Sequence, residues 1–201
     1  ERRLAMDEDF MFTVTQTVRN TGDQRTTLYP YGLISRAGTP PVSGFFILHE
    51  GLIGVLQDTL VEHDYDDLQD EPRGTIEDTT TGGWIGITDK YWLAAIALAP
   101  DQRADTRFVH TLTNGRDRYQ TDIRGGAFEV APGAEVTFES RVFAGAKEVH
   151  LLDRYSEELG ITNFILFPSI ADALKDEEAS FAWSDDNFYL QAIADIKARF
   201  P

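Results

Sequence analysis

The chain of 201 residues contains no cysteine, which excludes disulfides, thiolate nucleophiles and cysteine-bound metals. Basic residues are also scarce, because 18 lysines and arginines stand against 34 aspartates and glutamates and leave a net charge of −16. A surface of this sign repels the phosphates of nucleic acids and anionic lipid head groups. We therefore expect no nucleic acid as a partner.

Long hydrophobic runs are missing as well. The longest strictly apolar run, residues 91–99, is about half as long as a membrane-spanning helix requires. We therefore expect no membrane span. The chain enters a strand-like stretch almost at once and shows no signal peptide, so we expect a fragment cut from a longer protein.

Alternating apolar and polar residues dominate the first three quarters of the chain, which indicates β-structure. Hydrophobic residues make up 42 % of the chain, enough for one substantial core, so we expect one large antiparallel β-sandwich. Strands are predicted at residues 10–18, 26–29, 32–36, 44–49, 51–56, 83–88, 91–97, 106–113, 119–123, 126–130 and 135–144.

Turn residues separate these segments. Residues 20–23 are expected to form a hairpin turn between the first two strands. Gly82 and Gly83 permit a positive φ at a chain reversal, and Pro132 with Gly133 suits the centre of a type II turn.

The pattern changes at Lys147. Residues 148–159 carry Leu152, Tyr155 and Leu159 on one apolar stripe, and Gly160 follows as a helix C-terminal cap. Further helices are predicted at 169–179 and 187–200. The sequence thus predicts a sandwich over residues 1–146 and a helical extension over residues 147–201 that packs on it.

One pair of residues has the types needed for catalysis. His49 and Glu50 are adjacent at the end of an apolar strand, and such a pair can act as acid and base in sugar or acyl chemistry. With Trp84 and Trp92 as stacking faces, they form an alternative hypothesis, a carbohydrate-binding or mutarotase-like sandwich. The interpretation we favour is a histidine that bonds to the backbone at a strand end, with the tryptophans packed in the core.

Other signatures of chemistry are missing from the sequence. It contains no G-x-S-x-G elbow and no phosphate-binding loop. Residues 63–67 have no zinc or EF-hand spacing and are interpreted as a solvated acidic loop. His110 and His150 are isolated. We therefore predict no catalytic, cofactor-binding or metal site, and a protein that is not an enzyme.

Several separated motifs nevertheless resemble, in the right order, one family: the large periplasmic domain of the YidC membrane protein insertases of Gram-negative bacteria. The resemblance covers roughly residues 7–161 and ends near residue 162. The motifs are YPYGLI at 29–34, SGF and HEG within 43–51, YDDL at 65–68, GGWIGITDKYW at 82–92, RVFAGAKE at 141–148, and LLDRY and LGI within 151–161.

The resemblance implies a β-super-sandwich of mutarotase-like shape that is not catalytic and lies on the periplasmic face of the inner membrane. It implies that the domain contacts accessory subunits of the Sec translocon and nascent membrane proteins, and that its C-terminal helix braces the membrane core of the insertase. The matching helix is 148–159, so Leu152, Tyr155 and Leu159 become candidate partner or core contacts. In this family further strands precede residue 7, so we expect an incompletely covered sheet edge.

Overall fold

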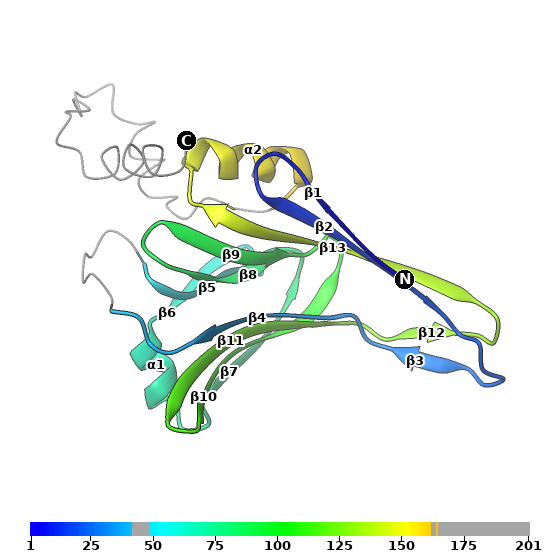
Figure 1. The fold of residues 1–201 in the computed structure, drawn as a ribbon, viewed down its shortest axis with the longest axis horizontal. Helices are drawn as coiled ribbons and strands as arrows, with labels where there is room; N and C mark the ends of the chain where they lie inside the picture. The colour runs from blue at the N-terminus through cyan, green and yellow to red at the C-terminus, as the bar shows by residue number, and fades with distance from the viewer. Residues whose placement is uncertain (42–48, 162–163, 165–201) are drawn as a thin grey trace.

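The computed structural model describes residues 1–41, 49–161 and 164. Two antiparallel sheets stack face to face, and a small two-stranded sheet of β3 (Thr26–Leu28) and β12 (Phe128–Val130) lies beside them (Figure 1). The larger sheet has the order β1 (Arg2–Met6), β2 (Met11–Arg19), β13 (Glu135–Ala146), β9 (Trp92–Ala97), β8 (Trp84–Thr88), β5 (Gly51–Leu56) and β6 (Thr59–His63). The smaller sheet has the order β4 (Tyr31–Ala37), β11 (Arg116–Gly125), β10 (Arg103–Thr113) and β7 (Thr75–Thr81).

Two hydrophobic cores lie on the two faces of the larger sheet, because its central strands are apolar at every position rather than at alternate ones. The first core fills the space between the sheets and contains Ile85 and Ile96 of the larger sheet with Phe108 of the smaller one. The second core lies on the opposite face, where α2 (Val149–Leu159) covers the sheet (Figure 1). The molecule is therefore layered as helix, sheet and sheet, and the predicted sandwich with a C-terminal helix is confirmed.

The predicted turns are largely confirmed. Gly82, Gly83 and Gly133 all have positive φ angles, and Gly160 ends α2 in the left-handed conformation. The turn at 20–23 is the exception, because β2 and β3 do not pair with each other. β2 pairs with β1 and β13, whereas β3 pairs with β12, so this turn connects two different sheets and is not a hairpin.

Residues 63–67 are not a loop, contrary to the prediction from sequence. His63 ends β6, and α1 (Tyr65–Asp70) begins directly after Asp64. The Asp67 carboxylate accepts a hydrogen bond from the Asp64 N–H at 2.9 Å, which caps the helix start. Tyr65 and Leu68, one turn apart, are buried and hold this short acidic helix against the sandwich.

Three strands were not predicted: β1, β6 and β7. Each is partly or wholly exposed. In β7, polar residues at nearly every position hide the alternation of inward and outward side chains. The predicted strand at 44–49 falls mostly outside the described residues, and so do the predicted helices at 169–179 and 187–200. Neither helix in the described part of the chain has the length and apolar content to cross a bilayer.

Candidate functional site

Helix α2 is the element to which the sequence assigned a contact role, and the structure shows which way its apolar stripe faces. The helix starts shortly after β13 ends, so the chain passes directly from a central strand into the helix. Leu152 and Tyr155 are 2 % and 4 % exposed and lie in the core between α2 and the larger sheet, and Leu159 packs on that core while partly buried. All three side chains thus contact the sandwich of their own chain.

Aromatic contacts fill this second core. The Tyr155 ring meets Phe143 of β13 edge-on, with centroids 6.1 Å apart. Phe143 in turn meets Phe164, which lies beyond the end of α2, and Phe164 meets Trp84 of β8 at 5.2 Å. Phe164 therefore packs on the sheet together with α2.

Polar bonds at the edge of this core fix the helix to the turn between β1 and β2. The Tyr155 hydroxyl donates to the Asp7 carboxylate at 2.6 Å, and Arg154 forms an ion pair with Asp9. Burial acts to raise the pKa of Asp7, but hydrogen bonds from Tyr155 and from the amides of Met11 and Asp9 outweigh it and hold the pKa below its usual value. Burial and the same hydrogen bond raise the pKa of Tyr155.

The opposite face of α2 is exposed and charged. His150, Arg154, Glu157 and Glu158 all lie on the solvent side. A helix held rigidly by one face and charged on the other can present its outer side chains in a fixed arrangement to a second body. This outer face of α2 is the part of the helix that another protein could reach.

The four residues of the alternative sugar site are not brought together. Trp84 is fully buried in the core beneath α2, whereas Trp92 is 46 % exposed. Trp84 is paired with Ala97, and Trp92 lies an odd number of positions before Ala97 on β9, so the two indoles belong to opposite faces of the sheet. They also lie at opposite ends of that pair of strands.

His49 and Glu50 point into different surroundings. The His49 ring nitrogen Nε2 lies 3.0 Å from Leu52 O, and Nδ1 lies 3.3 Å from the Asp64 carboxylate. The charge of Glu50 instead acts on Lys147 and Arg36. The His49 ring is thus held by Leu52 and Asp64.

Lys147 is a buried cation that no sequence pattern singled out. It joins β13 to α2, is only 8 % exposed, and donates its backbone N–H to Tyr91 O at 3.0 Å. Burial lowers the pKa of its amine to about 8, against the attraction of the carboxylates of Glu50, Asp89 and Glu62. These carboxylates therefore offset only part of the cost of burying the charge at the junction where the helix leaves the sheet.

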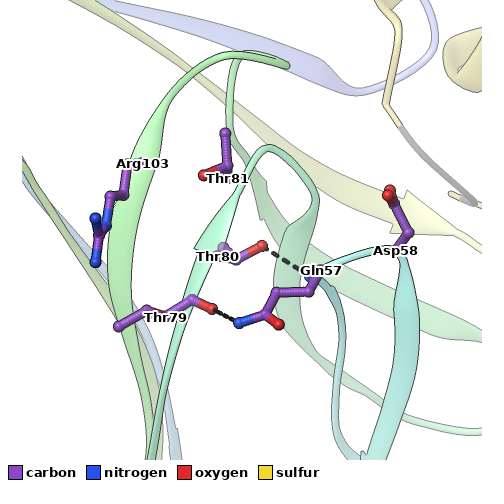
Figure 2. A pocket seen from close by; sticks show the side chains of 6 residues that line it. All are labelled: Gln57, Asp58, Thr79, Thr80, Thr81 and Arg103. Atoms are coloured by element: carbon purple, nitrogen blue, oxygen red, sulfur yellow. Dashed lines mark hydrogen bonds between the residues drawn. The ribbon is translucent and has the colours of Figure 1, made fainter.

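A shallow polar pocket of about 340 Å³ lies where the turn between β5 and β6 meets β7 (Figure 2). The Gln57 N–H donates to the Thr80 hydroxyl at 3.0 Å, and the Gln57 side-chain amide donates to Thr79 O at 2.7 Å. The Thr80 hydroxyl also donates to Gly82 O. These bonds hold the turn against the smaller sheet, so we assign the pocket a structural role. Its lining residues are Gln57, Asp58, Thr79, Thr80, Thr81 and Arg103.

His110 makes structural contacts too. His110 Nε2 lies 2.9 Å from the Asp117 carboxylate across the β10–β11 pair, and its ring stacks on Tyr119. Among the residues that the structure describes, no group of three or more metal-ligating side chains comes together.

Comparison with known proteins gives a family. The model of the YidC periplasmic domain matches residues 1–166. Curated relatives described as membrane protein insertase YidC include those of Beijerinckia indica, 47 % identical over 168 residues, and Methylorubrum extorquens, 44 % identical over 174 residues. The alignments cover 82 % and 83 % of this chain but only 27 % and 28 % of the relatives, so the chain spans little more than a quarter of their length.

A solved structure also matches in part. It is a Klebsiella pneumoniae protein described as an aldose 1-epimerase, with a TM-score of 0.37 and 13 % identity over 76 % of this chain and 47 % of that one. At this TM-score and sequence identity, the similarity gives no information about the chemistry of the chain.

Proposed function

The chain belongs to the YidC periplasmic domain family, and on that premise we propose that it is a non-catalytic domain of a membrane protein insertase at the periplasmic face of the inner membrane. It docks accessory subunits of the Sec translocon and braces the membrane part of the insertase through α2. Its mechanism is positioning, without making or breaking bonds. Its contact with the membrane runs through parts of the insertase outside this chain.

The observation that supports this proposal is the way α2 is mounted. Its inner face is buried through Leu152 and Tyr155, its first turn follows the central strand β13, and its outer face is charged and exposed. A helix held in this way transmits a force, or the effect of a partner bound at its outer face, to the whole sheet. The His49 ring is occupied by Leu52 O and the Asp64 carboxylate, which supports a role without acid and base catalysis by this pair.

The test is amide hydrogen exchange of this chain with and without the purified periplasmic portion of the Sec accessory complex. We expect slower exchange on α2, and we expect Glu158→Lys on its outer face to weaken the effect by reversing a charge at the contact. Leu112→Lys, at an exposed position near the end of β10, is the matched control and should leave it unchanged.

Exchange that stays the same at every described residue would contradict docking. Slower exchange around His49 on addition of a simple sugar, with no response to the Sec portion, would favour the carbohydrate alternative instead.

A further inference from the structure

The turn between β1 and β2 holds an aromatic residue in a backbone conformation that aromatic residues rarely adopt. Glu8, Asp9 and Phe10 form the loop, which the Asp7 N–H closes by donating to Met11 O at 3.1 Å. Hairpin loops of this length commonly end on a left-handed residue, and glycine suits that position. Here the residue is Phe10, with a φ of +70°. The Cβ atom of an L-residue is crowded in this conformation, so phenylalanine adds backbone strain.

Phe10 is also exposed, at 51 %. One exposed phenylalanine is ordinary on a protein surface, but here it coincides with a strained backbone. The other non-glycine residues with positive φ in the described ranges are Gln57, Asp58 and Asn114, all polar. Strain of this kind is concentrated at binding and catalytic sites. The combination therefore directs attention to what the Phe10 ring contacts outside its own domain.

The turn is held firmly in this conformation. Asp7 Oδ1 accepts hydrogen bonds from the N–H groups of Asp9 and Met11, each at 2.9 Å. The Phe10 carbonyl accepts a hydrogen bond from the Ala144 N–H of β13 at 3.2 Å. These bonds fix the backbone on both sides of Phe10, so the direction of its side chain is fixed as well.

The same turn is tied to α2 and lies beside it (Figure 1). The hydrogen bond from Tyr155 and the ion pair of Arg154, described above, both end on this turn. Gly145 at the end of β13 leaves room for the aromatic side chain, because a Cβ atom there would lie 3.2 Å from Phe10 Cβ. The Phe10 ring thus has a fixed place next to the helix.

We propose that Phe10 is the anchor residue of the docking surface of this domain, and that its ring enters an apolar pocket with a basic rim on the protein that meets the outer face of α2. A rigidly held aromatic ring supplies a large contact area and loses little conformational entropy on binding. The strained backbone is the cost of presenting the ring at this point.

Charge selects the kind of partner. Asp7, Glu8 and Asp9 place consecutive carboxylates directly before Phe10, on a chain whose net charge is −16. A second copy of the chain or an anionic lipid surface would be repelled at this turn. A protein with basic side chains around an apolar pocket complements both the ring and the carboxylates.

This inference rests on the proposed function, because it assigns a further contact to the same docking event. The experiment below separates the two, since it measures the response of α2 and the contribution of Phe10 in the same titration.

The test titrates the full chain with the purified periplasmic portion of the Sec accessory complex and follows amide exchange of α2. Phe10→Gly should raise the Kd by at least about tenfold, because the ring is lost. The same variant should raise the Tm by about 2–4 °C, because glycine relieves the left-handed strain. Weaker binding by a more stable domain cannot result from unfolding.

Three further variants separate the ring, the backbone and the charge. Phe10→Tyr keeps the ring and should stay within about threefold of the parent Kd. Asn114→Gly places glycine at another left-handed position, in the turn between β10 and β11, and should leave the Kd within about twofold. Glu8→Lys reverses a charge beside the ring and should raise the Kd about tenfold at low salt and less at high salt.

Equal Kd values for the parent and Phe10→Gly would overturn this inference while the response of α2 still supports the proposed function. A parent chain that shows no response to the Sec portion would overturn both. A lower Tm for Phe10→Gly would show that the ring stabilises its own domain, which contradicts the assignment of Phe10 as an anchor for a partner.

Discussion

Two glycines share a left-handed backbone but have different surroundings. Gly83 has a φ of +80°, and a Cβ atom there would lie 2.1 Å from Val55 O. Gly115 has a φ of +72° with nothing within 4 Å of its Cβ position. A methyl group at Gly115 costs only backbone strain, whereas at Gly83 it also collides with the carbonyl of a neighbouring strand.

We therefore expect Gly115→Ala to lower the free energy of unfolding by about 1 kcal/mol and Gly83→Ala by more than about 3 kcal/mol. Urea denaturation of both variants measures the difference. Equal losses would mean that β8 can move away from β5 at little cost, against the close approach seen here.

The buried amine of Lys147 makes stability depend on pH. Its pKa is about 8 in the folded chain and 10.5 in the unfolded one. Below pH 8 both states are protonated, and the folded state carries the full cost of burying the charge. Between pH 8 and 10.5 only the unfolded state keeps the proton, so the free energy of unfolding should rise with pH by up to about 1.4 kcal/mol per unit.

The measurement compares urea denaturation of the parent and of Lys147→Met between pH 8 and 10. The parent should gain stability relative to the variant across this window. Tyr65, whose pKa burial raises to about 12, acts in the opposite direction above pH 10, where the unfolded tyrosine ionises first. A constant difference between parent and variant would show that Lys147 titrates alike in both states.

At the scale of elements, one buried leucine and one hydrogen bond are among the contacts that hold α2 on the sheet. We expect Leu152→Ala to cost about 2–5 kcal/mol, because it leaves a cavity beneath the helix. Tyr155→Phe keeps the ring but removes the bond to Asp7, and should cost about 1–3 kcal/mol. Glu157→Ala on the exposed face should change the free energy of unfolding by less than about 0.5 kcal/mol.

Limited proteolysis separates loosening of the helix from global unfolding. Cleavage within residues 149–159 should become faster in the Leu152 and Tyr155 variants while the sandwich stays intact. Unchanged cleavage in both variants would contradict the role given to these contacts.

Elements with a strong periodicity of hydrophobic residues could be predicted from the sequence. The spacing of Leu152, Tyr155 and Leu159 gave the range and buried face of α2, and most strands with apolar residues on one or both faces were found. Helix α1 was missed because its six residues carry only Tyr65 and Leu68 as apolar anchors among carboxylates. β1 was missed because every residue in it is exposed, so burial places no constraint on its sequence.

At the scale of the whole molecule, the sandwich and the family could be predicted, and the partners of each strand could not. Pairing joins residues far apart in sequence, as when Tyr155 of α2 bonds to Asp7 across 148 positions. No local sequence pattern predicts such a contact. The burial of Lys147 and the separation of Trp84 from Trp92 follow from the same long-range pairing, so both became visible only in the folded chain.

The position of β13 governs how this molecule would respond to a mechanical pull. The strand is bonded to β2 on one side and β9 on the other, and it continues almost directly into α2. Tension applied at the far end of the helix would run along β13 and load both ladders in shear, so many hydrogen bonds would resist together. An edge strand such as β1, bonded on one side in the described structure, could be peeled away one bond at a time.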